Sequence, residues 1–123
     1  MKMSCLFDTL CVHVDLTSSE LRNNICNYLG DNPKMFEETK AEDYVIWNGE
    51  GFNNLQDYIS RMRNSGTWGG AIEIKAFCNM YNKHINVYDT QKKGVINFVD
   101  DERKNRKTID INWNGGHYWN KEL

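Results

Sequence analysis

Residues 71–89, AIEIKAFCNMYNKHINVYD, contain a change of pattern that decides the fold class. In residues 71–81 the apolar side chains surround the whole helix axis, and a helix of this kind is predicted to lie deep between two layers. Residues 84–89, HINVYD, are β-branched or alternating instead, which is typical of a strand. The stretch therefore predicts a buried helix that leads into a sheet.

Helical patterns precede this stretch. The clearest is TSSELRNNICNYLG, in which Thr17 and Glu20 fit a capping box and Gly30 fits a helix end. The same spacing rules predict three other segments, namely helices at residues 5–14, at residues 33–36 after Asn32, and at residues 55–62. Residues 41–51, AEDYVIWNGEG, are predicted to be an irregular or short extended connection.

Strand patterns follow the buried helix. GVINFV at residues 94–99 and TIDINW at residues 108–113 are short and β-branched, NGG at residues 114–116 predicts a turn, and HYW begins a last strand. Helices first and strands afterwards predict an α+β domain, with helices packed on a small, mostly antiparallel sheet. A chain of 123 residues with 40% hydrophobic content can bury one core, so residues 1–123 are predicted to form a single domain.

Composition argues against two classes of partner. The net charge is −2 and the pI is about 5.9, so nothing resembles the basic surface that binds nucleic acid. No apolar run approaches the ~20 residues that span a bilayer, and no signal peptide is apparent, so we expect a cytoplasmic protein without a membrane partner. The four cysteines include no C-x-x-C pair, which favours free thiols over disulfides or a metal site.

One of these cysteines is placed for chemistry. Cys5 precedes the first predicted helical face, and the partial positive charge at a helix N-terminus favours the thiolate. Thiols in such positions have pKa values of roughly 3.5 to 7.5, against about 8.5 for a free cysteine. Cys11, Cys26 and Cys78 lie inside predicted helices, where core packing is the default role of a thiol.

A thiolate nucleophile needs a base, and the chain has three histidines. His13 and His84 are predicted to be ordinary surface or loop residues. His117 follows two glycines and precedes two aromatic residues, a setting in which the backbone can approach closely and bulky rings restrict the imidazole. A cysteine near the N-terminus with a histidine far downstream is also the order of papain-like thiol proteases.

Four segments carry a family resemblance, and they read SCLFDTL (4–10), SSELRNNICNYL (18–29), YISRMRNSGTWGGAIEIKAFCNMYNKHINVYD (58–89) and GGHYW (115–119). In this order they resemble the ovarian tumour (OTU) family of deubiquitinating cysteine proteases over nearly the whole chain. The family motifs correspond here to Cys5 with Leu6 and Phe7, Arg22, Trp68 to Gly70 with Glu73, and His117 with Tyr118. The small size resembles the OTU domains of viruses or of microbes that manipulate a host.

The resemblance implies hydrolysis of the isopeptide bond after the C-terminal glycine of ubiquitin. Cys5 would be the nucleophile and His117 the general base, while Ser4 and the Cys5 N–H would form the oxyanion site. A narrow channel for the Gly-Gly tail would be lined by five residues, Trp68, Gly69, Gly70, Tyr118 and Trp119. The alternative for Trp68 is a place in the core, and Glu73 is expected to be structural.

Two positions depart from the family pattern. Lys2 stands where the family has an Asp before the cysteine, which leaves Met3 and Ser4 to build a minimal loop. Trp119 stands where an Asp or Asn usually orients the histidine, and its indole N–H cannot accept a hydrogen bond. Asn120 is the expected substitute, and Asn112, Asn114 or a backbone carbonyl are the alternatives.

The first hypothesis is therefore a monomeric deubiquitinating thiol protease that acts on ubiquitin or a ubiquitin-like modifier without a cofactor. It would work in the cytoplasm, or in the host-cell cytoplasm if a virus encodes it. The alternative is a catalytically weak or inactive OTU-like module that binds ubiquitin, which Lys2 and Trp119 favour. A third hypothesis is a papain-like acyltransferase or a peptidase with another substrate.

Overall fold

A computed structural model of the chain describes residues 5–48, 51–98 and 106–121. Within these residues, helices and strands follow one another in the order α1 (Cys5–Cys11), α2 (Ser18–Gly30), β1 (Lys34–Phe36), β2 (Thr39–Lys40), α3 (Ala41–Asn48), α4 (Leu55–Met62), α5 (Ala71–Tyr81), β3 (Lys83–Asp89), β4 (Gly94–Phe98), β5 (Lys107–Trp113) and β6 (Tyr118–Asn120). None of the helices in the described ranges is both long and apolar enough to cross a membrane.

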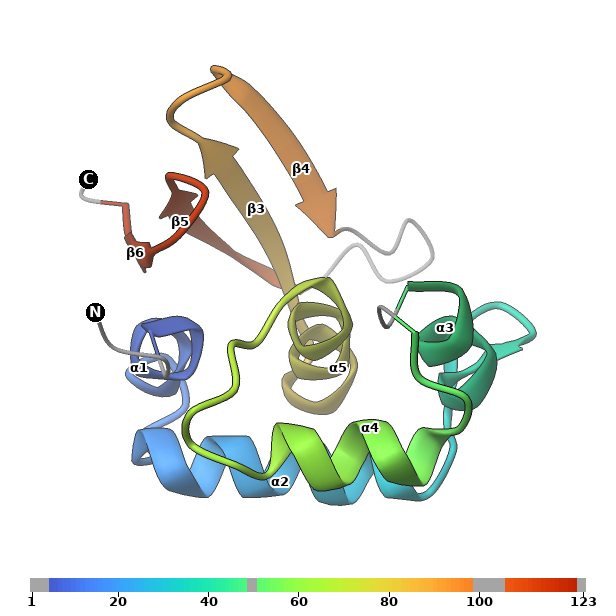
Figure 1. Cartoon of the computed structure of the whole chain (residues 1–123). Helices are drawn as coiled ribbons and strands as arrows, with labels where there is room; N and C mark the ends of the chain where they lie inside the picture. Colours follow the sequence, from blue (N-terminus) through green and yellow to red (C-terminus); the bar gives the residue numbers. More distant parts are fainter. Residues whose placement is uncertain (1–4, 49–50, 99–105, 122–123) are drawn as a thin grey trace.

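The main sheet has the strand order β4-β3-β5-β6. β3 is antiparallel to β4 and parallel to β5, and β5 is antiparallel to β6. Figure 1 shows this sheet on one side of the helices, with α5 between the sheet and a layer formed by α2 and α4. The predicted α+β class, with helices on a small and mostly antiparallel sheet, is confirmed.

The core lies around α5. The helix buries seven consecutive residues, from Ile72 to Cys78, as its all-round apolar pattern predicts. The sheet contributes buried residues from alternate positions of its central strands, Ile85, Val87, Ile109 and Ile111. Because α5 is surrounded, its first turn is held firmly, and that turn borders the candidate site described below.

The second helix begins and ends as predicted. The Thr17 hydroxyl accepts a hydrogen bond from the Glu20 N–H at 3.1 Å, and the Glu20 carboxylate accepts one from the Thr17 N–H at 3.0 Å. This capping box satisfies two amide groups that would otherwise lack partners at the helix start. The helix ends at Gly30. The side chain of Arg22, in its first half, contacts Phe7 of α1 and Met62 at the end of α4.

Three sequence-based predictions of secondary structure were wrong. The segment predicted to be a helix after Asn32 is instead β1, which pairs with β2 in a small hairpin. Asn32, before β1, and Glu37, between the two strands, have positive φ. The connection predicted at residues 41–51 contains helix α3, which buries Ala41 and Val45 one turn apart. The first helix ends at Cys11, before Val14.

Candidate active site

Cys5 is the first residue of α1, and its side chain is buried at 6% exposure. Three apolar residues of the same helix, Leu6, Phe7 and Leu10, are almost completely buried and fix the helix in the core. A helix of seven residues has little stability of its own, so this packing holds it in place. Lys2, Met3 and Ser4, including the oxyanion role predicted for Ser4, lie outside the described residues.

The other cysteines are packed away from solvent as free thiols, as predicted. Burial raises the pKa of Cys26 and of Cys78 to about 11 each. Burial, followed by the nearby Asp8 carboxylate, also raises the pKa of Cys11. These three thiols are therefore poor nucleophiles near neutral pH.

Gly69 brings the loop before α5 against the helix that carries Cys5. A Cβ atom at this position would lie 2.9 Å from Leu6 Cδ2 and 3.0 Å from Phe7 Cε2. At the neighbouring Gly70, an added Cβ would meet nothing within 4 Å. The absence of a side chain is therefore needed at Gly69 for close packing, whereas Gly70 is the N-cap of α5.

Arg22 fixes the beginning of the same loop. Its Nη1 atom donates to the carbonyl oxygens of Met62 at 2.8 Å and Asn64 at 3.0 Å. Its guanidinium also lies 4.2 Å from the centre of the Phe7 ring, a cation–π contact with α1. One buried side chain thus ties α2, the end of α4 and α1 together.

Glu73 holds the other end of the loop. Its carboxylate accepts hydrogen bonds from the Gly70 N–H at 2.7 Å and from the Tyr58 hydroxyl at 2.5 Å. Burial raises the pKa of Glu73 to about 7, although both hydrogen bonds act in the opposite direction. Its contacts place Glu73 in the helix cap, in agreement with the structural role expected for it.

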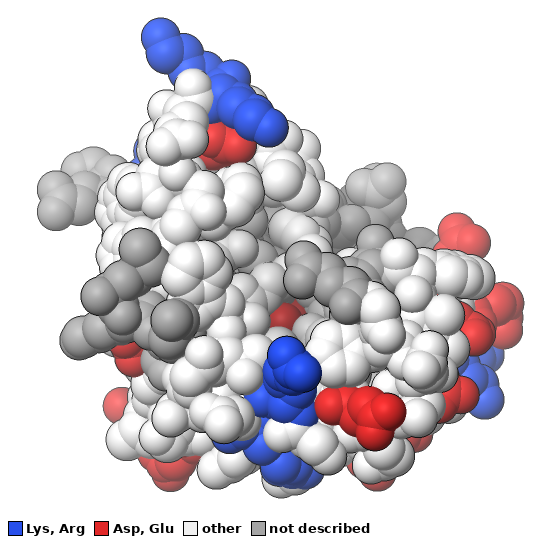
Figure 2. All heavy atoms as spheres, viewed as in Figure 1, with Lys and Arg blue, Asp and Glu red and all other residues white. Residues whose placement is uncertain are grey.

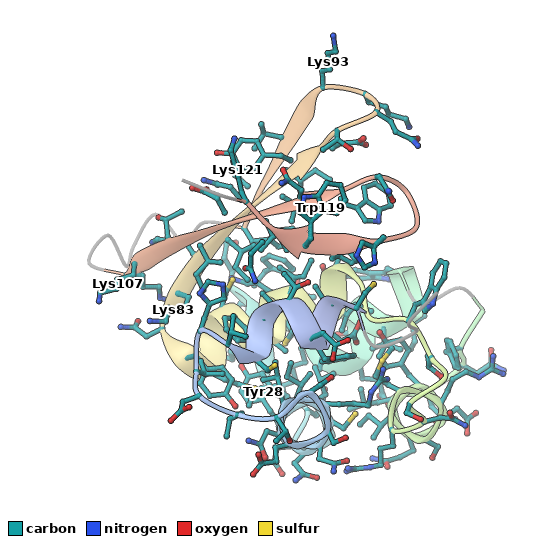
Figure 3. All side chains as sticks on the ribbon, turned by 90° about the vertical axis from the view of Figure 1, so that its left-hand side faces the viewer. Tyr28, Lys83, Lys93, Lys107, Trp119 and Lys121 are labelled. Carbon is teal, nitrogen blue, oxygen red and sulfur yellow. The ribbon has the colours of Figure 1, made fainter. Side chains whose placement is uncertain are left out.

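The turn between β5 and β6 presents His117. The turn is closed by the Asn114 N–H, which donates to the His117 carbonyl at 3.2 Å, and Gly115 adopts a φ of +96°. The His117 side chain is exposed, and its ring stacks on Trp119 with centroids 5.9 Å apart and planes 17° apart. Figure 3 shows Trp119 on the β5–β6 end of the sheet, above α1.

Thr9 connects α1, which begins at Cys5, to β6, which begins just after His117. Its buried hydroxyl lies 2.7 Å from the Cys5 carbonyl oxygen and 3.1 Å from the Tyr118 carbonyl oxygen. Burial, and then the charges of Cys5 and Glu73, raise the pKa of Tyr118 to about 12. Thr9 therefore joins the helix that begins at Cys5 to the strand that begins one residue after His117.

Asn120 contributes to the same contact and not to His117. Its Nδ2 donates to the Thr9 carbonyl at 3.0 Å, and its Oδ1 lies 2.6 Å from His13 Nε2. Both ends of the amide are thus engaged with α1 and the residues that follow it. Tyr118 and Asn120 project to one side of the strand and His117 and Trp119 to the other, so the orienting role predicted for Asn120 does not match its contacts.

A cleft of about 1040 Å³ opens between these elements. Cys5 lines it together with four residues of the predicted channel, Trp68, Gly69, Gly70 and Tyr118, and with Gly115 and Gly116 of the histidine turn. Figure 2 shows a hollow on this face, with acidic atoms at its bottom and Lys or Arg atoms on its lower rim. Trp68 is 45% exposed and so is not a core residue.

Neither His117 nor Trp119 is among the described residues that line this cleft, although the two glycines before His117 are. This gives no support to the channel role predicted for Trp119. Sequence reasoning also missed the far wall, where Phe52, Asp57 and Arg61 from α4 and the preceding loop contribute. No sequence signal marks them, because α4 is an ordinary amphipathic helix. His84, predicted to be a surface or loop residue, is buried in β3 at 5% exposure.

Comparisons with known proteins agree with this geometry. The family described as OTU-like cysteine protease matches residues 3–118. Proteins called ubiquitin thioesterase OTU1 from Danio rerio and Mus musculus are each 29% identical over 125 residues, covering 94% of this chain. A solved OTU domain in complex with ubiquitin superposes with a TM-score of 0.74 at 24% identity, covering 97% of this chain and 63% of its own.

The chain spans 36% of the Danio rerio relative and 32% of the Mus musculus relative. The similarity therefore concerns one part of those proteins. At 24% identity, the superposition on the solved domain establishes the fold.

Proposed function

Because the chain belongs to the OTU-like cysteine protease family, we propose that it is a deubiquitinating thiol protease. It would hydrolyse the isopeptide bond after the C-terminal glycine of ubiquitin or a ubiquitin-like modifier. The observation that supports the proposal is that Thr9 joins α1 to β6, so that Cys5, Tyr118 and the two glycines before His117 border one open cleft. The names of the relatives and the ubiquitin complexes of similar folds support the substrate class.

The proposed reaction has two steps. The Cys5 sulfur attacks the carbonyl carbon of the last glycine while His117 accepts the thiol proton. The tetrahedral intermediate then expels the substrate amine, which takes that proton from His117, and a thioester remains on Cys5. Water, deprotonated by His117, attacks the thioester and releases the glycine carboxylate and the thiol.

The oxyanion of each tetrahedral intermediate needs a donor close to Cys5. The Cys5 N–H lies at the first position of α1, where backbone amides have no partner within the helix. This amide is the proposed donor, and Ser4 is the proposed second contributor. Removal of a single donor of this kind typically costs roughly 10² to 10³ in kcat.

The Gly-Gly tail would lie along the loop before α5. Gly69 and Gly70 leave backbone without side chains on this wall, while Trp68 and Tyr118 flank it with aromatic surface. Such a channel accepts residues without side chains and excludes larger ones. The acidic net charge of the chain suits the arginines that precede the Gly-Gly of ubiquitin.

We further propose that residues 1–123 act as one domain and as a monomer, without a cofactor and without nucleic-acid or membrane partners. The proposed location is the cytoplasm, or the host-cell cytoplasm for a virus-encoded protein. Size-exclusion chromatography with light scattering tests the monomer, since a stable dimer would elute at twice the chain mass of 14.4 kDa.

A ubiquitin-binding module without catalytic power is the second candidate. The observation that favours it is that Asn120 is held by His13 and Thr9, away from His117. A peptidase or acyltransferase with another substrate is the third, and it predicts cleavage of unrelated peptide esters in preference to ubiquitin conjugates.

The deciding experiment uses ubiquitin with a C-terminal thiol-reactive electrophile and follows the adduct by intact mass. The protease predicts one adduct that is absent in Cys5→Ala and slowed in His117→Ala by roughly 10² or more. Cys11→Ser, in the same helix, is the matched control and should keep the adduct. Ubiquitin binding without an adduct would refute the protease and support the ubiquitin-binding module. An adduct that persists in Cys5→Ala would refute Cys5 as the nucleophile.

A further inference from the structure

The stacked rings of His117 and Trp119 have no role in the scheme above. Their centroids are 5.9 Å apart and their planes differ by 17°. The two residues are separated by one position at the start of β6, so their side chains project from the same side of the strand. The backbone of Trp119 is fixed by pairing opposite Asn112 of β5.

An exposed imidazole on a turn samples several rotamers unless a neighbour limits them. A nearly parallel indole within the distance range of aromatic stacking disfavours the imidazole rotamers that leave it. The stacked geometry therefore favours a fixed orientation of the His117 ring.

The neighbouring asparagine cannot take this role while it keeps its own contacts. Asn120 uses both ends of its amide on Thr9 and His13, on the opposite side of β6. Those contacts hold the strand on α1, and among the described residues Trp119 contacts the His117 side chain through the ring pair. Asn120 thus holds the strand, and the adjacent Trp119 contacts the imidazole.

We propose that Trp119 is a positioning residue for His117, which holds the imidazole by ring stacking where a hydrogen-bond acceptor would otherwise orient it. This inference rests on the proposed protease function. It assigns Trp119 to the general base and not to the substrate channel. The expected consequence is that Trp119 contributes to kcat and leaves KM nearly unchanged.

Two substitutions separate stacking from simple surface packing. Trp119→Phe keeps an aromatic face, whereas Trp119→Leu keeps apolar bulk without a π-system. With a fluorogenic ubiquitin conjugate, Trp119→Leu should lower kcat roughly two- to tenfold and Trp119→Phe should lie between Trp119→Leu and the wild type. KM should stay within about twofold, and thermal unfolding should show that both variants are folded.

Tryptophan emission tests the stacking without using activity. An imidazole stacked on an indole quenches part of the indole fluorescence. The emission intensity of the wild type minus that of Trp119→Phe gives the contribution of Trp119. This contribution should be larger when both proteins also carry His117→Ala, because the quenching imidazole is then absent. The matched difference for Trp47→Phe should not change with His117→Ala, because Trp47 is 72% exposed on α3.

Several results would overturn the proposal. They are an unchanged kcat in Trp119→Leu, a Trp119→Phe variant as slow as Trp119→Leu, an effect on KM alone, or an emission difference that is insensitive to His117→Ala. A wild-type protein without activity would refute the proposed function instead. The emission cycle would then decide by itself whether Trp119 orders the His117 ring.

Discussion

Replacing Gly69 by alanine should destabilise the protein through the packing of the cysteine helix. The new Cβ would lie 2.9 Å from Leu6 Cδ2 and 3.0 and 3.1 Å from two atoms of the Phe7 ring. Leu6 is 1% exposed and Phe7 is fully buried, and the Phe7 ring is also covered by Arg22. Both side chains are packed in the core, so they, α1 or the loop must shift.

Overpacking of a filled core typically costs about 1–3 kcal/mol. For a chain of this length, about 1 kcal/mol corresponds to roughly 4 °C in Tm, so the expected loss is roughly 4–12 °C. Urea unfolding followed by circular dichroism, together with thermal melting, measures both quantities. The rate of Cys5 labelling by the ubiquitin electrophile should also fall, because the displaced residues directly follow Cys5 in α1.

Gly70→Ala is the matched control. Its Cβ would meet nothing within 4 Å, and its φ of −152° is open to alanine. The loss of chain entropy in the unfolded state and the weaker N-cap nearly cancel, so we expect a change within about 0.5 kcal/mol. Equal stability of the two variants would refute the argument that Gly69 is required by close packing.

Three further predictions concern the contacts around the site. Thr9→Val should cost about 1 kcal/mol in urea unfolding and slow Cys5 labelling, and Thr9→Ser should restore both; an equally slow serine variant would contradict the hydroxyl contact. Arg22→Lys should lower the free energy of unfolding in urea by about 1–3 kcal/mol, because a lysine cannot bond several carbonyls and stack at once; an unchanged free energy would exclude this role. Glu73 binds its proton more tightly in the folded state, so its contribution to stability should fall as pH rises from about 4.5 to about 7. The difference in urea stability between wild type and Glu73→Gln should therefore depend on pH in that window, and a constant difference would refute the raised pKa.

The elements with strong periodicity could be predicted from sequence. Helix α5 is apolar all round and α2 carries a capping box, so local pattern and final structure agree at both. The strands that follow α5 show the β-branched pattern that a sheet needs. The mixed strand order was not predictable, because β4, which lies between β3 and β5 in sequence, pairs with one side of β3 and leaves the other side to β5.

The errors lie where local signals compete with tertiary contacts. Asn32 and Pro33 have the chemistry of a helix start, but the chain instead forms a hairpin that buries Met35. Residues 41–48 are rich in aromatic and β-branched residues, and α3 buries only a narrow stripe at Ala41 and Val45 within its described side chains. A stripe of two residues is too short to reveal a helical period.

The candidate site was predictable where it follows motifs. Cys5 and the Trp68 to Gly70 segment were found through their motifs and line one cleft. The partners of Asn120 were not predictable, because its amide meets Thr9 across 111 positions of sequence. Such a contact depends on how α1 meets the sheet edge, and no local pattern contains that information.

The docking of α1 on β6 has a consequence for the newly made chain. Thr9 leaves the ribosome long before Asn120, 111 positions later, has been added. At roughly 5–20 residues per second, the first helix waits on the order of 5–20 seconds for the strand on which it packs. Over that interval the nascent protein carries Cys5 without His117, its proposed base, so the proposed activity can begin only after the last strand has been made.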